Sequence, residues 1–368
     1  MEGSATTVPR YRCESVALGK IGQSREWSVE ILSLNDPSGG HELSYSDIEV
    51  GFAGCMRAKS RFVLSGLWKA FGARGAGTSI IVAAHPNLGV PASWMRWIHP
   101  GLQTITMAHG IDVWKPLPTR RLRALQEARL VIVPSRNTAQ KVAEVQGIPE
   151  SRIRRLPLPL NPNFLRLART AKDLRLPANF PKGHIILTVG RWASSERYKG
   201  ADELIFAVAH ILDTIPDLHL VMVGTGDDLP RLRGIVVERK IGEHVHFFEY
   251  LPQEEVAACY ANAHVFALPS TGEGYGLVFL EAMAFAKPVV GVAAGGATDL
   301  VRDGINGLLI PPNDVQRLAQ SLTCLLQDEP LRKRLGDSGA AIVRREYTFD
   351  AFCDSLERIL SEVESVPS

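Results

Sequence analysis

The chain has 368 residues, of which 45% are hydrophobic and 22% are charged, and this balance excludes an intrinsically disordered protein. At about 150 residues per domain, the length favours two domains. Lys and Arg exceed Asp and Glu by only two, 41 against 39, so the net charge indicates neither a nucleic-acid-binding protein nor a wholly membrane-coating one.

The charge is unevenly distributed along the chain. Residues 1–165 contain 20 basic and 12 acidic residues, a net charge of +8, which leaves 21 basic and 27 acidic residues, or −6, for the remainder. Residues 50–111 contain six basic residues and neither Asp nor Glu. The first half therefore contains a long segment with basic residues and no acidic ones, and chance does not readily explain the absence of acidic residues over that length.

Cysteine usage and hydropathy bear on the cellular compartment. The five cysteines form no Cys-x-x-Cys pair, and their odd number argues against a disulfide framework and a zinc knuckle: Cys13, Cys55, Cys259, Cys324 and Cys353. A reducing compartment fits this usage. No apolar run reaches the roughly 18 residues that span a bilayer, and the first seven residues do not resemble a signal peptide. We therefore expect a cytoplasmic protein.

The second half alternates short β-branched runs with helix-length segments. Strands are predicted at 185–189, 218–223, 245–248, 265–268, 288–292 and 307–310, and helices between them at 201–212, 229–240, 254–262 and 277–285. Because parallel neighbours need a crossover connection, this alternation predicts a parallel sheet covered by helices on both faces. The pattern is that of a Rossmann-like domain.

The first half has the same rhythm, with strands predicted at 28–34, 79–84, 103–108 and 130–134. A second Rossmann-like domain follows. Between the two, five prolines within residues 156–183 favour a linker, with a hinge near residues 165–180. Helices are predicted after the last strand, at 315–326, 331–345 and 350–363.

A glycine-rich segment, residues 269–284, follows one predicted strand and leads into a helix, which is where open parallel sheets bind ligands. Its glycines permit close approach of a ligand, and the helix N-terminus offers N–H groups to an anion. Glu273 lies in the loop and Glu281 about one turn into the helix, roughly 6 Å along its axis, so they do not form a close carboxylate pair. The spacing suits two contacts with one extended ligand, such as a sugar nucleotide, better than a hydrolase site.

This segment resembles the Glu-x7-Glu signature of retaining glycosyltransferases of family 4. These proteins have the α/β GT-B fold, two Rossmann-like domains facing across a cleft. Further segments are similar to the family's other landmarks in order and spacing: the Gly-Arg…Lys-Gly loop at 189–200, then 223–226, 248–252 and 295–307, where Asp299 replaces the usual glutamate. The resemblance covers residues 185–348 closely and the first half loosely. One Glu-x7-Glu is a weak signal, whereas five landmarks in order are specific.

The resemblance implies sugar transfer with release of a nucleoside diphosphate. It implies retention at the anomeric carbon by front-face attack, with the leaving phosphate helping to deprotonate the acceptor. Arg191 and Lys199 would stabilise the charge on the leaving phosphate, Glu273 would contact the transferred sugar, and Glu281 would contact the ribose. The remaining donor contacts implied are Gly224, Tyr250, Leu251, Gly274, Tyr275, Gly276, Leu277 and Val278. No Asp-x-Asp pair occurs, so we expect no metal, and no cofactor besides the nucleotide sugar as co-substrate.

Residues 106–114 end a predicted strand and turn on a glycine, and they look like the family's His-Gly segment. The resemblance places His109 against the transferred sugar, where it would bind a hydroxyl and position the reacting centre. The family opens with a strand and a Gly-Gly turn. Here residues 28–34 look like the second strand and Gly39-Gly40 follows it, so we expect a late start or a divergent first strand.

Several of these residues also have ordinary structural explanations. Arg191 and Lys199 by themselves resemble surface charges, and His109 resembles a histidine held by a hydrogen bond at a strand end. His244 and His246 share one strand face without a third ligand nearby, which disfavours a metal site. Residues 223–226 begin like a dinucleotide fingerprint, but Asp227 and the residues after it replace the third glycine.

The acid-free region contains a predicted basic amphipathic helix at residues 56–71. One apolar face is expected to hold Phe62, Val63, Leu64, Leu67, Trp68 and Phe71, with Arg57, Lys59, Arg61 and Lys69 near it. Such a helix can lie on anionic lipid. A crossover helix that packs on the sheet with a solvated basic edge explains the pattern equally well.

The predictions combine into one hypothesis. Residues 1–165 form the acceptor domain, 166–348 the donor domain, and 349–368 a helix packing back on the acceptor domain. The favoured function is a hexosyltransferase acting on a glycan or lipid-linked acceptor in cell-surface polysaccharide or glycolipid assembly, as a peripheral membrane protein at the inner face. The alternatives are a GT-B epimerase or phosphorylase, and a non-catalytic relative that binds a sugar nucleotide.

Overall fold

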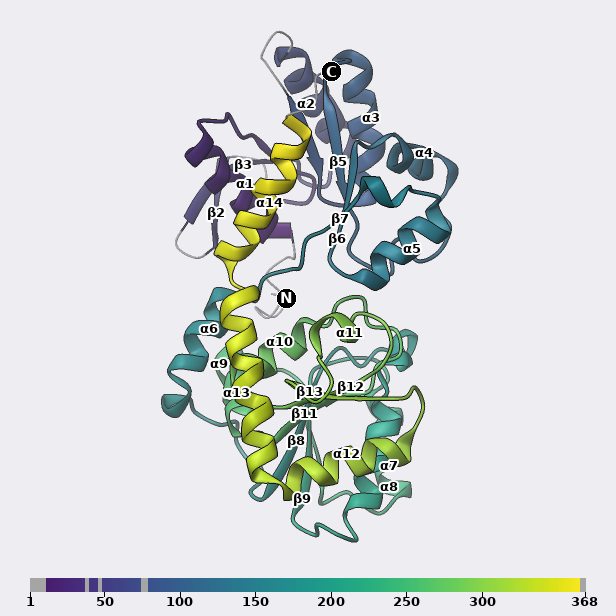
Figure 1. The fold of residues 1–368 in the computed structure, drawn as a ribbon, viewed down its shortest axis with the longest axis vertical. Helices are drawn as coiled ribbons and strands as arrows, with labels where there is room; N and C mark the ends of the chain where they lie inside the picture. Colours follow the sequence, from purple (N-terminus) through teal and green to yellow (C-terminus); the bar gives the residue numbers. More distant parts are fainter. Residues whose placement is uncertain (1–10, 37–39, 46–47, 74–78, 365–368) are drawn as a thin grey trace. The chain divides into compact units, whose positions relative to one another are not determined.

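The computed structural model describes residues 11–36, 40–45, 48–73 and 79–364, and these form two compact units. Of the described residues, the N-terminal unit comprises those from 11 to 159 together with the last helix, from residue 349, and the C-terminal unit comprises residues 160–348. Figure 1 shows this exchange of the chain end: the yellow helix α14 (Phe349–Glu364) lies beside the purple helix α1 (Tyr11–Arg25).

The C-terminal unit contains a sheet of six parallel strands in the order β10-β9-β8-β11-β12-β13. Their bounds are β8 (His184–Val189), β9 (Leu218–Val223), β10 (Val245–Phe248), β11 (Val265–Leu268), β12 (Val289–Val292) and β13 (Gly307–Ile310). The chain builds β8 to β10 in one direction and then returns to pair β11 with the other side of β8. The strand order therefore reverses between β8 and β11.

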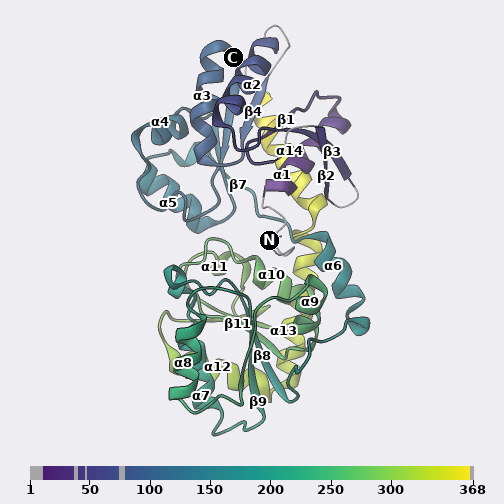
Figure 2. The ribbon, with the colours of Figure 1, turned by 180° about the vertical axis from the view of Figure 1, so that it is seen from behind.

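Helices cover both faces of this sheet, which is why its strands are apolar on both sides, with Ile186 and Leu187 fully buried. One face carries α7 (Ala201–Ile211), α8 (Leu229–Glu238) and α12 (Val315–Gln327); the other carries α6 (Pro162–Arg169), α9 (Gln253–Asn262), α10 (Leu277–Ala284) and α13 (Glu329–Glu346) (Figures 1 and 2). A short helix, α11 (Ala297–Leu300), follows β12, and 3-10 turns lie at Ala171–Asp173 and Ser194–Lys199.

The N-terminal unit contains a four-stranded parallel sheet in sequential order: β4 (Ile80–Ala83), β5 (Gln103–Met107), β6 (Leu130–Val133) and β7 (Ile153–Arg155). Its helices are α2 (Lys59–Gly72), α3 (Gly89–Ile98), α4 (Thr119–Glu127) and α5 (Arg136–Gln146), with 3-10 turns at Pro86–Leu88 and Glu150–Arg152. Helix α5 shows the usual end signals. The Ser135 hydroxyl accepts the Thr138 N–H, and Gly147 ends the helix in the left-handed region.

The prediction for residues 28–34 was wrong in its placement. Strand β1 (Ile31–Ser33) pairs with β3 (Ile48–Gly54), which pairs antiparallel with β2 (Gly40–Tyr45), and these strands form a separate sheet. β1 is three residues long and only half-buried, whereas the strands of a helix-covered parallel sheet are buried on both faces. Gly39 lies outside the described residues, so the structure does not describe the Gly39-Gly40 turn.

The proline-rich segment is not wholly a linker, because α6 forms within it. Pro162 stands in the first turn, where its missing N–H is not needed, and the Asn161 side chain caps the helix by accepting the Asn163 N–H at 2.9 Å. Phe164 and Leu167 are buried. Capping and a buried face therefore outweigh the proline content there.

The last helix is held in the N-terminal unit by burial and ion pairs. Val16 and Ala17 of α1 and Phe352 and Leu356 of α14 are buried. Around them, Lys20 pairs with Asp350 at 2.6 Å, Arg25 with Glu357, and Arg154 with Glu362 at 2.7 Å. These exposed pairs contribute little each, so burial of the shared face carries the association.

Two helical glycines give opposite predictions for the C-terminal unit. A Cβ at Gly336 of α13 would lie 2.0 Å from the Ala286 carbonyl oxygen, whereas one at the exposed Gly234 of α8 would meet nothing within 4 Å. Gly336→Ala is expected to destabilise the unit by about 1–3 kcal/mol through overpacking. Gly234→Ala is expected to stabilise it by about 0.5–1 kcal/mol through helix propensity. Urea midpoints measure both, and equal shifts would contradict the close packing of Gly336.

Candidate functional site

Four loops at the carboxyl ends of β8, β9, β11 and β12 meet at the reversal of strand order. Main-chain hydrogen bonds join them: Gly190 N–H to Val223 O at 3.0 Å, Trp192 N–H to Thr225 O at 2.8 Å, Thr271 N–H to Tyr198 O at 2.8 Å, and Gly296 N–H to Glu273 O at 2.7 Å. A reversal point of this kind is where open α/β sheets bind ligands. The loops therefore form one continuous backbone platform.

Gly224 is required where the loops after β8 and β9 cross. Its φ is +124°, and a Cβ there would lie 1.8 Å from the Gly190 carbonyl oxygen. A side chain would therefore separate the two loops, since both the backbone conformation and the space admit only glycine. This position is one of the predicted donor contacts.

The structure brings the two predicted cations together on one carboxylate. Lys199 Nζ lies 3.0 Å from Glu196 Oε2, and Arg191 also forms an ion pair with Glu196. Lys199 Nζ donates to the Arg191 carbonyl oxygen at 3.2 Å. Glu196 is buried, while the Arg191 side chain is 69% exposed and accessible to a ligand. Glu196 could not be predicted, because its position in the sequence does not show that the folded loop brings its carboxylate to both Arg191 and Lys199.

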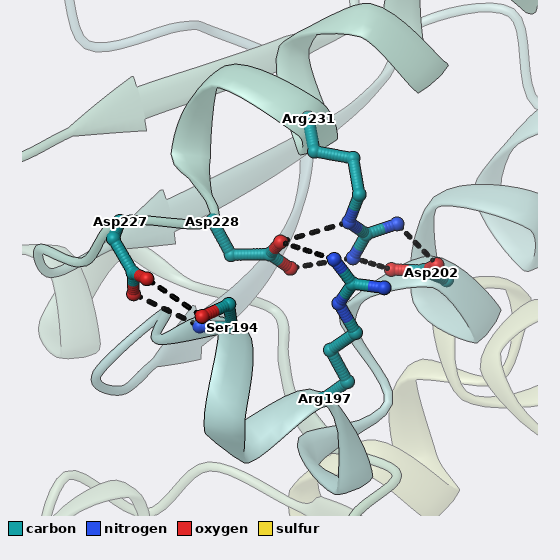
Figure 3. Close-up of polar contacts among 6 residues, drawn as sticks. All are labelled: Ser194, Arg197, Asp202, Asp227, Asp228 and Arg231. Atoms are coloured by element: carbon teal, nitrogen blue, oxygen red, sulfur yellow. Dashed lines mark hydrogen bonds and ion pairs between the residues drawn. The ribbon is translucent and has the colours of Figure 1, made fainter.

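A second set of ion pairs anchors the loop that carries these cations (Figure 3). Asp228 accepts from Arg231 at 2.5 and 2.8 Å and from Arg197 at 3.2 Å, and Arg231 also reaches Asp202 at 2.6 and 2.7 Å. Arg231 holds the pKa of the buried Asp228 carboxyl below its usual range, and Asp228 with Asp202 raises the pKa of Arg231. Arg197 of the loop is thereby joined to Asp228 at the start of α8. Arg231 of α8 extends the network to Asp202 of α7.

Asp227 fixes the middle of the same loop. Its carboxylate accepts the Ser194 N–H at 2.9 Å and the Ser194 hydroxyl at 2.6 Å (Figure 3), and these bonds lower the pKa of Asp227. Asp227, the first residue after Gly226 in this apparent dinucleotide fingerprint, thus has a structural role of its own. It orders the loop between Arg191 and Lys199.

The two glutamates of the Glu-x7-Glu segment have different surroundings. Glu273 lies in the loop near Tyr198. Burial of the Tyr198 phenol is the larger cause of its raised pKa, and the negative charge of Glu273 raises that pKa further. Glu281 lies on α10, where it accepts a hydrogen bond from the Tyr260 hydroxyl at 2.8 Å. Burial raises the pKa of Glu281 to about 7, against the opposing effect of that hydrogen bond. Tyr260 was missed, since the contact between α9 and α10 is tertiary.

The other predicted donor contacts lie on two loops. Gly274 and Tyr275 precede α10, and Gly276 stands at its N-cap with φ +91°. Leu277 and Val278 occupy the first turn of the helix and are half-buried. The Tyr275 ring is buried, so its main chain is the part nearest the platform: a Cβ at Gly296 would lie 2.6 Å from Tyr275 Cα. Tyr250 and Leu251 follow β10, and Tyr250 is highly exposed.

His109 lies in the N-terminal unit, just after β5, whereas the other candidate catalytic residues lie in the C-terminal unit. Its Nε2 lies 2.8 Å from the Ala84 carbonyl oxygen, which can only accept, so Nε2 carries a proton. Its main-chain N–H reaches Asp112 Oδ2 at 3.3 Å, and His85 Nε2 lies 3.7 Å from the same carboxylate. Burial lowers the pKa of His85.

His244 and His246 lie beside His219 of the neighbouring strand. His219 Nδ1 and His246 Nε2 are 3.1 Å apart, and His244 Nδ1 bonds the Leu218 carbonyl oxygen at 2.9 Å. Burial lowers the pKa of His219 and of His246. Within the described ranges, no group of three His, Cys, Asp or Glu side chains is arranged to hold a metal ion. Nor does any described helix have the length and apolarity to cross a bilayer.

Comparison with known proteins identifies the class. The family model for glycosyl transferases group 1 matches residues 172–341, and the model for glycosyltransferase family 4 matches residues 23–164. The Anabaena protein HepE in complex with UDP superposes with a TM-score of 0.69 at 20% identity, covering 82% of each chain. Two parallel α/β sheets, each with its own helices, and this similarity define the GT-B fold.

Two relatives illustrate the sequence similarity. A D-inositol 3-phosphate glycosyltransferase of Corynebacterium aurimucosum is 32% identical over 204 residues, covering 54% of this chain and 47% of the relative. A GDP-mannose-dependent phosphatidylinositol monomannoside mannosyltransferase of Mycolicibacterium smegmatis is 31% identical over 248 residues, covering 64% of each. The match thus spans about half the length of the first relative. The chain belongs to glycosyltransferase family 4.

Glu281→Gln is expected to stabilise the protein at alkaline pH. The pKa of Glu281 is higher in the folded protein than in the unfolded chain, so the folded state favours the neutral carboxyl. This contribution to stability is fully present below the unfolded pKa and is lost as the pH rises through the folded pKa of about 7. Gln cannot ionise, and its side-chain oxygen still accepts from Tyr260. The variant's advantage should therefore grow from near zero at about pH 4.5 to at most about 3 kcal/mol at about pH 8.

Thermal unfolding measured across this pH range checks the expectation. Glu238→Gln, a substitution of an exposed glutamate on α8, is the matched control and should show no such pH dependence. If Glu281→Gln and its parent unfolded with the same difference in melting temperature at both ends of the range, the raised pKa of Glu281 would be contradicted.

Glu196→Gln is expected to tighten the binding of inorganic pyrophosphate roughly fivefold. The amide retains the shape and an acceptor for Arg191 and Lys199 but removes the buried negative charge that competes with an external anion. Isothermal titration calorimetry measures the affinity. Glu238→Gln, which removes an exposed negative charge of α8 outside these loops, is the control and should leave the affinity unchanged. Weaker binding by Glu196→Gln would show that its charge only maintains the loop.

Proposed function

We propose that the protein is a retaining hexosyltransferase that moves a sugar from a nucleoside diphosphate donor to a glycan or lipid-linked acceptor. The observation that carries the proposal is the meeting of Arg191 and Lys199 at the reversal of strand order, on a loop bonded directly to the Glu273 loop. The C-terminal domain, residues 166–348, takes the donor, and the N-terminal domain, residues 1–165, takes the acceptor.

Charge development on the leaving diphosphate is the main barrier that such a site lowers. Arg191 can grip two phosphate oxygens at once, and Lys199 adds a compact charge. The N-terminus of α10, which follows Gly276, adds the N–H groups of its first turn and the positive end of the helix dipole. These groups give the leaving phosphate its stabilisation without requiring a metal ion.

The two glutamates orient the donor from its two ends. Glu273, in the loop before α10, accepts hydroxyls of the transferred sugar, and Glu281 accepts a ribose hydroxyl. The hydrogen bond from Tyr260 holds the Glu281 carboxyl in one orientation. Because the ionised form accepts more strongly, donor affinity is expected to rise as the pH passes through the Glu281 pKa of about 7.

His109 positions the transferred sugar from the N-terminal domain. The hydrogen bond from Nε2 to the Ala84 carbonyl oxygen holds the ring in one orientation, in which His109 would contact a sugar hydroxyl. The acceptor attacks from the face that the diphosphate leaves, and the departing phosphate takes the proton of the attacking hydroxyl. The bond to the anomeric carbon forms as the bond to the phosphate breaks, with retention.

The relatives support the class of donor and acceptor. One is GDP-mannose-dependent and acts on a phosphatidylinositol monomannoside, another acts on D-inositol 3-phosphate, and a structural neighbour contains UDP. A nucleotide sugar and a polyol or glycolipid acceptor fit this group. We therefore place the reaction in cell-surface glycolipid or polysaccharide assembly, on the cytoplasmic side of a membrane and in peripheral contact with anionic lipid.

The donor site is tested by thermal shift with UDP-, GDP-, ADP- and TDP-sugars. One nucleotide class is expected to raise the melting temperature of the parent by mass action. Arg191→Ala should weaken that donor about 100-fold, because it removes a charged hydrogen-bonding partner of the diphosphate. Arg344→Ala, an exposed arginine on α13, is the matched control and should bind like the parent. A shift that Arg191→Ala retains would contradict the site.

The reaction itself is tested with the donor so identified. A transferase releases the nucleoside diphosphate only when an acceptor such as inositol phosphate or a phosphatidylinositol mannoside is added, and Glu273→Gln should abolish this release while the donor still binds. An epimerase would interconvert the sugar nucleotide without acceptor. Binding of the donor without any turnover across the acceptor set would favour a non-catalytic binding protein.

A further inference from the structure

Histidines gather at the amino ends of the strands in the C-terminal unit, the edge of the sheet opposite the candidate donor site. Five of them lie at the first or second residue of a strand or immediately before one: His184, His219, His244, His246 and His264. The ring of His264, just before β11, bonds the main chain of the neighbouring strand. Its Nδ1 lies 3.1 Å from the main-chain nitrogen of Ile185 in β8.

The bond to Ile185 defines the protonation state of the His264 ring. Because an N–H group can only donate, His264 Nδ1 must accept, and the neutral ring then carries its proton on Nε2. The main chain of His264 adds a second bond, since its N–H donates to the Ile185 carbonyl oxygen at 2.9 Å. A proton on Nδ1 would set one N–H against another and break the bond between the ring and Ile185.

The ring of His264 supports the shortest strand pairing of the six-stranded sheet. β11 and β8 share two registered residue pairs, whereas β8 and β9 share six. Ile185 is buried, so solvent does not readily replace the acceptor that the ring provides for its N–H. A side chain thus completes a pairing that the main chain alone leaves short.

The surroundings of His264 oppose a positive charge on its ring. Burial lowers the pKa of His264 to about 4, and Arg332 of α13, His184 and Lys287 lower it further, while Asp217 acts in the opposite sense. Two main-chain carbonyl oxygens at the end of α12, each at 2.9 Å, hold Arg332 in place. The His184 ring centroid lies 5.4 Å from that of His264, and the Asp217 carboxylate accepts from His184 Nδ1 at 2.9 Å.

We propose that His264 is an acid-sensitive latch on the pairing of β11 with β8. The neutral ring closes the latch. A proton on Nδ1 opens it, because the proton removes the acceptor of a buried N–H and adds a cation beside Arg332 and Lys287. The loops that carry Arg191 and Glu273 leave the other end of the same two strands, so opening loosens the platform between them. The latch goes beyond the proposed reaction and does not depend on it.

The pH dependence of stability tests the latch with the variant His264→Asn. The Asn side chain offers an oxygen acceptor to the Ile185 N–H but cannot be protonated. Histidine in the unfolded chain binds a proton near pH 6.5 and the folded His264 only near pH 4, so the parent loses stability as the pH falls between these values.

Urea unfolding measures this difference. The ratio of the parent's unfolding equilibrium constant to that of His264→Asn is expected to rise at least about tenfold from about pH 7.5 to about pH 4.5. This is less than the full difference in proton affinity, because the ring is only half-buried and solvent screens part of the effect. His210→Asn replaces an exposed histidine of α7 and, as the matched control, should keep the pH dependence of the parent.

A second variant, His264→Leu, removes the acceptor and keeps an apolar side chain. Its unfolding equilibrium constant should exceed that of the parent about tenfold at about pH 7.5, because the Ile185 N–H loses its partner. Hydrogen exchange of the Ile185 amide should be faster in His264→Leu, whereas His264→Asn should retain the slow exchange of the parent.

Nitrogen NMR of the parent reports the protonation state of the ring directly. With ¹⁵N-labelled histidine, the His264 ring should have an unprotonated Nδ1 and a protonated Nε2 at about pH 7.5. This pattern should persist down to about pH 5, below the pKa of an ordinary histidine. Loss of one set of signals in His264→Asn assigns the resonances.

Three results would overturn the proposal. The first is a proton on His264 Nδ1 at neutral pH, a measurement that needs only the parent and so decides the matter even where a substitution prevents folding. The second is an equal loss of stability in acid by the parent and His264→Asn. The third is slow exchange of the Ile185 amide in His264→Leu, which would assign that N–H to another acceptor. None of these measurements uses a sugar donor or acceptor, so failure here is distinguishable from failure of the proposed reaction.

Discussion

The pairing of β11 with β8 is the constraint on which the candidate donor site depends. Because the chain builds β8 to β10 in one direction and then returns to the other side of β8, the loops after β8 and β11 leave the sheet side by side. That geometry brings residues about 80 positions apart in the chain, such as Arg191 and Glu273, onto one platform. Main-chain hydrogen bonds then hold the loops without using the side chains that a ligand needs.

Two carboxyls of this unit have contrasting surroundings. The buried Asp228 carboxylate, which anchors the loop after β8, is matched with Arg231, and the pKa of Asp228 falls. In the part of the chain that the structure describes, the hydrogen-bond partner of the Glu281 carboxyl is the neutral phenol of Tyr260, and burial raises the pKa of Glu281 to about 7. A buried carboxyl without a cation beside it lowers the stability of the fold. A ligand hydroxyl that donates hydrogen bonds to this carboxyl would explain why the residue is present. The unit thus gives up stability at the position that the proposed reaction uses.

The sequence predicted the C-terminal sheet well because its strands are continuous β-branched runs between glycine and proline signals. It predicted the meeting of Arg191 and Lys199 only through a motif, and it could not show Glu196 or Tyr260, whose roles arise from contacts across a turn and between helices. In the N-terminal unit it misplaced β1, since a three-residue half-buried strand carries too little pattern to reveal its partner. Helix α1 went unpredicted because its apolar positions show no clear helical periodicity.

Helix α2 shows why periodicity alone fails and what the failure means. At about 100° per residue, its apolar side chains spread over well more than half of the helix circumference, so no single face is indicated. The structure resolves the choice by packing: Gly66 and Ala70 permit the close approach of α3, and the larger Trp68 and Phe71 are left outside. The single apolar face predicted for residues 56–71 was wrong for this reason. Close packing against α3, rather than the size of the apolar side chains, decides which face of α2 is buried.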